Sequence, residues 1–122
     1  LDYAHGTGHG VGFFLNVHEG PQSISKYNTI EIEKGMILSN EPGYYKKNHF
    51  GIRIENLVYV NKLKNKLFFD NLTFAPLEKD LINYKLLDET EKDYLFKYHL
   101  NIYSKYSSLL NIKERKWLAN LI

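Results

Sequence analysis

The 122-residue sequence predicts an α+β fold, with antiparallel strands in the first part and helices in the last. Glycine occupies every second position from Gly6 to Gly12, and each glycine disfavours a helix by about 1 kcal/mol relative to alanine. Residues 51–60 alternate apolar with polar side chains, which is typical of a half-buried strand. From Asp88 onward, apolar residues recur every three or four positions, so the period changes to that of a helix.

The first part of the chain predicts short extended segments separated by turns. The glycine-rich start is expected to form a turn that leads into a strand over residues 13–18, and Glu19-Gly20-Pro21 ends that strand. A loop is expected over residues 25–28, followed by a short extended piece over residues 29–32. The alternation stops at Glu33-Lys34-Gly35, where a turn starts the next strand.

This next strand covers residues 36–41 and ends directly before Pro42. Because the residue before a proline is restricted to extended geometry, Glu41 is expected at a strand end with little backbone freedom. In the alternating strand that follows, a period of two places Arg53 and Glu55 on the same face. Two opposite charges on one face of a strand make a candidate site.

The closing part of the chain predicts a hairpin and then helices. Polar residues 61–66 separate the alternating strand from Leu67-Phe68-Phe69 and Leu72-Thr73-Phe74, which predicts a hairpin with a six-residue loop. The helical spacing predicts a helix over about residues 89–108 and a second, shorter helix over residues 113–120.

Asp88 and Glu91 resemble a capping box, which places the start of the first helix directly after Asp88. His49 and His99 are expected to be surface or helix-face residues rather than metal ligands.

Composition excludes several classes of function. The 16 Lys and Arg residues against 14 Asp and Glu residues leave a net charge of +2, which is too small for a salt-driven grip on nucleic acid. No apolar run approaches the roughly 20 residues of a membrane span, and the start lacks the layout of a signal peptide. Cysteine is absent, so any metal must be held by His, Asp or Glu. We therefore expect neither a nucleic-acid partner nor a membrane partner.

The residues that could carry chemistry gather in the first half of the chain. They are His5, His9, His18, Glu41 and Glu55, with Arg53 beside the last. The spacing of His5 and His9 is that of the helical zinc motif H-E-x-x-H, but Gly6 occupies the place of its glutamate. The glycines also lack the third position of the dinucleotide fingerprint, and no P-loop lysine follows them. The sequence therefore excludes the helical zinc motif and disfavours phosphate-binding loops.

One imidazole and two carboxylates near strand ends remain, which is a mixed nitrogen and oxygen ligand set. Such a set favours hard divalent ions such as manganese, with zinc and cobalt as competitors. A carboxylate that bridges two ions about 3.5 to 4 Å apart would give a two-metal site able to hold a hydroxide nucleophile. The alternative is that the histidine is a satisfied polar residue and that Arg53 and Glu55 form a surface pair worth about 0 to 1 kcal/mol.

Four blocks of residues stand in a fixed order in the first half of the chain. They are His5-Gly6-Thr7-Gly8-His9-Gly10-Val11-Gly12, Asn16-Val17-His18-Glu19-Gly20-Pro21, Ser39-Asn40-Glu41-Pro42-Gly43-Tyr44-Tyr45 and Gly51-Ile52-Arg53-Ile54-Glu55-Asn56. Together they resemble the C-terminal part of aminopeptidase P, the Xaa-Pro aminopeptidase of peptidase family M24, in its eukaryotic cytosolic type. Prolidase and methionine aminopeptidase share parts of the pattern, but the second and third blocks are closer to aminopeptidase P.

This resemblance implies a pita-bread fold, in which residues 1–77 form the C-terminal half of the catalytic domain and residues 78–122 a helical extension. It also implies a cytoplasmic homodimer with two divalent metal ions, manganese first and zinc or cobalt as alternatives. The implied reaction is hydrolysis of the bond between an N-terminal residue and a following proline by a metal-bridging hydroxide. A prolidase-type dipeptidase and a non-catalytic interaction module of the same fold are the alternatives.

The resemblance assigns metal ligands to His9, Glu41 and Glu55. Glu55 is expected to bridge the two ions, and Glu41 is also a candidate proton shuttle. Retention of all three residues argues against the non-catalytic module. The two aspartate ligands of the family come from strands upstream of the first histidine, so we expect the chain alone to bind metal weakly and to be inactive without that segment.

The remaining candidates match residues around the metal site. His5 and His18 match the histidines that line the substrate site and hydrogen-bond the peptide at the scissile bond. Arg53 matches the arginine that holds the bridging carboxylate in orientation. The expected substrates are peptides with proline at the second position.

Overall fold

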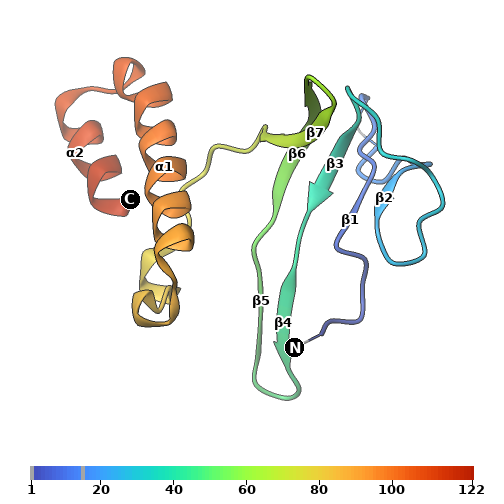
Figure 1. Ribbon diagram of the computed structural model, residues 1–122. Coiled ribbons are helices and arrows are strands. Elements are labelled where there is room, and N and C mark those ends of the chain that lie inside the picture. The colour runs from blue at the N-terminus through green and yellow to red at the C-terminus, as the bar shows by residue number, and fades with distance from the viewer. Residues whose placement is uncertain (1, 15) are drawn as a thin grey trace. The chain divides into compact units, whose positions relative to one another are not determined.

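The computed structural model describes residues 2–14 and 16–122 of the chain. The chain divides into two compact units, Leu1–Thr73 and Phe74–Ile122. The ribbon in Figure 1 shows the described strands in the first unit and the α-helices in the second. The α+β class predicted from the sequence, with strands first and helices last, is therefore confirmed.

Three small sheets form the first unit, and every pairing among the described strands is antiparallel, as predicted. The central sheet has the order β3-β6-β7, and the other two each consist of one pair of strands. The strands are β1 Gly8–His9 with β2 Ser23–Ile24, β3 Ile37–Asn40 with β6 Asn56–Leu63 and β7 Lys66–Asn71, and β4 Gly43–Lys46 with β5 Phe50–Arg53.

Backbone contacts attach the N-terminal segment along strand β3. The N–H group of Glu41 donates a hydrogen bond to the carbonyl oxygen of Thr7 over 2.7 Å. This close approach requires glycine at position 8, because a Cβ atom there would collide with the carbonyl oxygen of Ser39. His9, the next residue, is consequently held beside the end of β3.

The core of the first unit is small and apolar. It consists of the buried residues Leu38, Val58 and Val60, and Leu38 faces Val58 across the β3–β6 pair. Since side chains alternate along a strand, Leu38 points into this core and Ser39 points to the opposite face. Glu41, two residues after Ser39, belongs to that same opposite face.

The predicted strand over residues 13–18 is wrong. None of the described residues of this segment belongs to a strand, and Leu15 lies outside the described residues. The N–H group of Gly12 donates to the carbonyl oxygen of Asn16 over 2.8 Å, which closes the segment into a loop. A closed loop cannot run extended beside a neighbouring strand. Residues 29–32, predicted as a short extended piece, likewise belong to no described strand.

The single strand predicted over residues 51–60 is also wrong, because it is divided into β5 and β6, which lie in different sheets. The interruption lies opposite Pro42, which has no N–H group to donate to a ladder. Arg53 is therefore the last residue of β5, and Glu55 lies just before β6. The side chains of Arg53 and Glu55 are near each other, but they do not lie on one face of a continuous strand as predicted.

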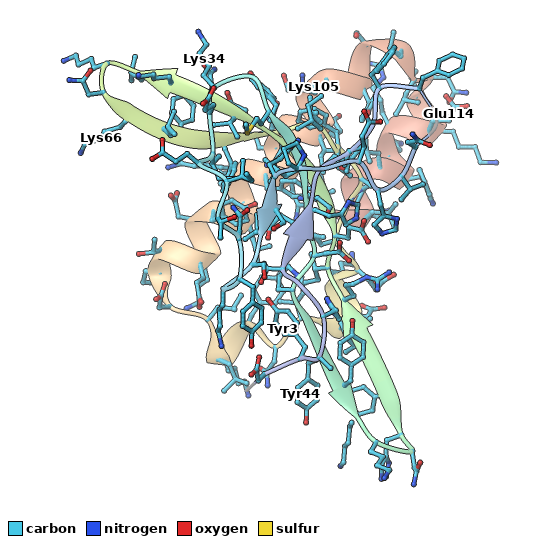
Figure 2. All side chains as sticks on the ribbon, turned by 90° about the vertical axis from the view of Figure 1, so that its right-hand side faces the viewer. Tyr3, Lys34, Tyr44, Lys66, Lys105 and Glu114 are labelled. Atoms are coloured by element: carbon cyan, nitrogen blue, oxygen red, sulfur yellow. The ribbon has the colours of Figure 1, made fainter. Side chains whose placement is uncertain are left out.

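The predicted hairpin exists, but its loop is shorter than expected. Strands β6 and β7 pair as far as Leu63 opposite Lys66, which leaves a two-residue turn in place of the predicted six-residue loop. Lys64 in this turn has a positive φ of 54°. Lys66 lies at the end of the hairpin (Figure 2) and is exposed. The first residues predicted to belong to the loop instead continue strand β6.

The second unit contains α1, Glu89–Tyr106, and α2, Ile112–Leu121, close to the bounds predicted from the spacing. Asp88 and Glu91 form the predicted capping box at the start of α1. A second capping box, not predicted, starts α2. The 3-10 helices are η1 Lys79–Leu81, η2 Tyr84–Leu86 and η3 Ser107–Leu109.

The two α-helices are held by a core of Tyr98, Ile102 and Leu118. His99 is on a helix face, but it is buried rather than on the surface, and its Nε2 accepts a hydrogen bond from the N–H of Leu77 over 3.2 Å. Burial lowers the pKa of His99 below its usual value. Within the described residues, no helix combines the length and the apolar character that crossing a membrane requires.

Candidate active site

His9 and Glu41, predicted as metal ligands, lie side by side. The Nε2 atom of His9 is 3.2 Å from Oε1 of Glu41. Both side chains are largely shielded, with 24% of His9 and 12% of Glu41 accessible to solvent. The pairing of the N-terminal segment with β3 brings them together, since His9 ends β1 and Glu41 directly follows β3.

The tautomer of His9 suits a metal ligand. Nδ1 lies 2.9 Å from the carbonyl oxygen of Gly10, and because a carbonyl oxygen only accepts, Nδ1 must carry the hydrogen. In the neutral ring, this leaves the lone pair of Nε2 directed toward the carboxylate of Glu41. Two electron-rich atoms that face each other in this way would both be attracted to a cation between them, so the pair fits a divalent metal ion.

Arg53 connects Glu41 with Glu55. Its Nε atom is 3.7 Å from Oε2 of Glu41 and 3.4 Å from Oε2 of Glu55. Within the described part of the chain, no three His, Asp or Glu side chains are close enough together to hold a metal ion. The structure therefore brings His9 and Glu41 into contact and places Glu55 next to them through Arg53.

Tyr45, which the sequence analysis did not select, links Arg53 with His5. The hydroxyl of Tyr45 is 2.7 Å from Nε2 of His5. A side-chain hydrogen bond to the same tyrosine, with the neighbouring charge of Glu55 as a smaller cause, raises the pKa of the Arg53 guanidinium. His5 thus belongs to the same polar network as the arginine beside the carboxylates.

Two glycines make room for the Tyr45 ring. A Cβ atom at Gly43 would lie 2.5 Å from the Tyr45 hydroxyl oxygen, and one at Gly51 would lie 2.7 Å from the ring. Gly51 is the cross-strand partner of Tyr45 in the β4–β5 pair, and Gly43 precedes it by two residues on the same face. This arrangement of glycines around an aromatic residue was the sequence signal that could have identified Tyr45.

His18, predicted to line the substrate site, lies against His9. The centroids of the two imidazole rings are 4.1 Å apart. His18 belongs to the loop that replaces the predicted strand, and it is exposed. All six candidates predicted from the sequence therefore lie in one region of the first unit.

Comparison with known proteins places this region in a family. The family model of metallopeptidase family M24 matches residues 1–62, and the model of the C-terminal region of peptidase M24 matches residues 65–121. Aminopeptidase P2 of Arabidopsis thaliana is 49% identical over 131 residues, which cover 98% of this chain and 18% of the relative. Xaa-Pro aminopeptidase 1 of Dictyostelium discoideum is 47% identical, with 100% of this chain and 22% of the relative covered.

A solved structure agrees with these relatives. The crystal structure of an X-prolyl aminopeptidase from Caenorhabditis elegans, described as a cytosolic enzyme with a di-nuclear active site, has a TM-score of 0.89 and 39% sequence identity. The match covers 99% of this chain and 22% of that one, so the chain spans about a fifth of the length of these relatives. The predicted fold, the C-terminal part of a pita-bread fold, is confirmed. The chain belongs to metallopeptidase family M24.

Proposed function

We propose that this chain forms part of a metal-dependent aminopeptidase that hydrolyses the bond between an N-terminal residue and a following proline. The observation that carries the proposal is the His9–Glu41 pair, whose 3.2 Å separation and imidazole tautomer suit a shared metal ion. Relatives named Xaa-Pro aminopeptidase, which match almost the whole chain, support proline-containing peptides as substrates.

The proposed site holds two divalent ions, with manganese as the first candidate and zinc or cobalt as alternatives. From this chain, His9 offers Nε2, and Glu41 and Glu55 offer carboxylate oxygens. When bound, two such ions activate water at neutral pH and neutralise the charge that develops on the scissile carbonyl oxygen. The description of the Caenorhabditis elegans relative as di-nuclear supports the number of ions.

The other residues of the network act on the peptide and on the ligands. His5 and His18 hydrogen-bond the peptide around the scissile bond; His18 is exposed and His5 is partly exposed. Arg53 holds the carboxylate of Glu55 in orientation from 3.4 Å. Glu41, which is mostly buried, accepts and returns the proton that moves during hydrolysis.

We further propose that upstream residues of the same catalytic domain, residues 1–77 being its C-terminal half and residues 78–122 its helical extension, supply two aspartate ligands. The chain covers only about a fifth of its relatives, which supports a contribution from outside it. Apolar side chains on two strands, Phe50 and Phe69, are about half exposed and would be covered by such residues. The chain alone is then inactive, and the complete enzyme is a cytoplasmic homodimer.

The test uses the complete enzyme with His9→Ala, and His49→Ala as a matched control from the β4–β5 turn. Metal content and hydrolysis of a tripeptide with proline second are measured together. We expect His9→Ala to lose both metal and activity, while the control keeps both. Full metal occupancy with normal turnover in His9→Ala would refute the ligand assignment. A preference for the Xaa-Pro dipeptide over the tripeptide would instead indicate a prolidase-type enzyme.

A further inference from the structure

We propose that Ser39 is a positioning residue that fixes both His9 and Glu41 for metal binding. The inference deepens the proposed function and rests on it, because it concerns how that site is held. Ser39 lies on strand β3, two residues before Glu41, and is fully buried. Its single hydroxyl group contacts both of the residues that we assign to the metal.

The contacts of this hydroxyl are well defined. Its oxygen accepts a hydrogen bond from the backbone N–H of His9 over 3.0 Å. The same oxygen lies 2.9 Å from Oε1 of Glu41 and donates to it. One atom thus joins strand β1, which carries the imidazole, to the carboxylate that follows β3.

The direction of each hydrogen bond follows from the chemistry of the groups. A backbone N–H can only donate, so the hydroxyl of Ser39 must accept from His9. A carboxylate only accepts, so the one hydroxyl hydrogen must point to Glu41. The bond to a charged acceptor is of the stronger, charge-assisted kind. Rotation of the hydroxyl cannot replace either contact, because the contact with His9 uses a lone pair of the oxygen and the contact with Glu41 uses the hydrogen.

These contacts give the two oxygens of Glu41 different partners. Oε1 faces Ser39 at 2.9 Å and His9 Nε2 at 3.2 Å. Oε2 faces Arg53 Nε at 3.7 Å. A carboxylate held on both sides cannot rotate freely about its last torsion. The oxygen nearest the imidazole is therefore presented in a fixed orientation, which lowers the ordering cost of binding an ion.

The backbone explains why serine fits here. The side chains of Ser39 and Glu41 lie on the same face of an extended segment because two residues separate them. Strand β1 approaches β3 closely only because Gly8 has no side chain, and this approach brings the His9 amide within reach of the hydroxyl. A side chain without a hydroxyl would leave a largely shielded amide and carboxylate oxygen without this partner.

The experiment compares Ser39→Ala and Ser39→Thr in the complete enzyme. Ser25→Ala is the matched control, because the Ser25 hydroxyl also accepts from a backbone amide, that of Tyr27 at 3.2 Å, but contacts none of the proposed ligands. The affinity of the metal-free enzyme for Mn²⁺ is measured by calorimetry, and the thermal unfolding midpoint of each metal-free variant is measured beside it. The visible absorption spectrum of the Co²⁺-loaded enzyme reports the geometry of the ligands.

We expect Ser39→Ala to bind Mn²⁺ about 10-fold to 100-fold more weakly and to give an altered Co²⁺ spectrum. Its unfolding midpoint should lie below that of the Ser25→Ala control, because two shielded hydrogen bonds are lost. Ser39→Thr keeps the hydroxyl and should restore affinity. Unchanged affinity and spectrum in Ser39→Ala would overturn the proposal. Weaker Mn²⁺ binding with an unaltered Co²⁺ spectrum would also overturn it, as would a folded Ser39→Thr enzyme that binds as weakly as Ser39→Ala. If the threonine variant does not fold, the Co²⁺ spectrum of Ser39→Ala decides.

The outcome also separates this proposal from the proposed function. A wild-type enzyme that binds no Mn²⁺ and cleaves no Xaa-Pro peptide would refute the function itself. A wild-type enzyme that does both, together with a Ser39→Ala variant that binds Mn²⁺ equally well, would refute only the role of Ser39.

Discussion

Tyr45 donates its hydroxyl hydrogen to Nε2 of His5 over 2.7 Å, although 40 positions separate them in the sequence. The direction is fixed because Nδ1 of His5 donates to the carbonyl oxygen of Gly6 over 2.7 Å, which leaves Nε2 as the acceptor. The same tyrosine also raises the pKa of the Arg53 guanidinium. One hydroxyl therefore couples a proposed substrate histidine to the arginine beside the proposed metal ligands.

This relationship predicts the effect of Tyr45→Phe in the complete enzyme. The phenylalanine ring still fits between Gly43 and Gly51, but the hydroxyl that orients His5 is lost. We expect kcat/KM to fall about 5-fold to 10-fold, the scale of one hydrogen bond, with metal content unchanged. Tyr44→Phe is the control, since Tyr44 (labelled in Figure 2) is the neighbouring residue and points to the other face of β4. Equal kinetics in the two variants would reduce Tyr45 to a packing role.

Arg53→Lys is predicted not to be conservative. The guanidinium lies near both carboxylates, 3.7 Å from Glu41 and 3.4 Å from Glu55, and a planar fork can hold two partners in different directions. An ammonium group is a single point charge, so we expect turnover to fall about 10-fold to 100-fold. The same exchange at the exposed Arg115 of α2 should leave turnover unchanged. If both variants behave like the wild type, Arg53 and Glu55 form only a surface pair.

His18→Ala tests the division between substrate and metal residues. His18 lies against the His9 ring, at 4.1 Å between centroids, yet it is exposed on a loop. We expect both metal ions to remain bound while kcat/KM falls roughly 100-fold, as when a group that stabilises the transition state is removed. Elemental analysis of the purified variant is the measurement. Loss of an ion would place His18 among the ligands instead.

His99 predicts a pH dependence of stability. Burial lowers its pKa in the folded state, so the unfolded chain takes up the proton first as the pH falls. Its contribution is complete above the ordinary histidine pKa of about 6.5 and is lost as the pH falls toward the folded value. Protonation also removes the acceptor for the Leu77 N–H.

The measurement is the midpoint of urea unfolding of the complete enzyme at neutral and mildly acidic pH. His99→Gln cannot take up a proton, so we expect its midpoint to fall less on acidification than that of the wild type. His49→Gln, an exchange of an exposed histidine, should fall as much as the wild type. Identical pH dependence in all three proteins would contradict the role given to His99.

Much of the site could be predicted from the sequence, because the candidate residues were identified by the order of their motifs. That identification does not depend on whether the strand predictions were correct. His9 and Glu41 were identified by residue type and sequence block, but their contact depends on how the N-terminal segment lies against β3. These segments are about 30 positions apart, and neither carries a local signal for the other. Tyr45 was missed although Gly43 and Gly51 mark the space for its ring, because nothing near it in the sequence indicates the contact of its hydroxyl with His5.

Other errors had local causes that the sequence contained. Pro42, between β3 and β4, has no N–H group to donate. The ladder of β3 with β6 therefore does not continue into the ladder of β4 with β5, and β5 and β6 are separate strands. His99 follows Leu95 by four positions and precedes Ile102 by three, so the helical stripe already placed it on the buried face. The loop over residues 13–18 was different, because its apolar side chains favoured a strand. Backbone hydrogen bonds from Gly12 to Asn16 and from Glu19 to Gly10 close it instead.

The central claim, that His9 and Glu41 hold one of the metal ions, is tested most directly by anomalous X-ray diffraction from crystals of the complete enzyme grown with Mn²⁺. We expect an anomalous peak at ligand distance from both Nε2 of His9 and a carboxylate oxygen of Glu41, with a second peak on the far side of Glu55. Manganese peaks that avoid His9 and Glu41, in an enzyme that still cleaves Xaa-Pro peptides, would contradict the claim.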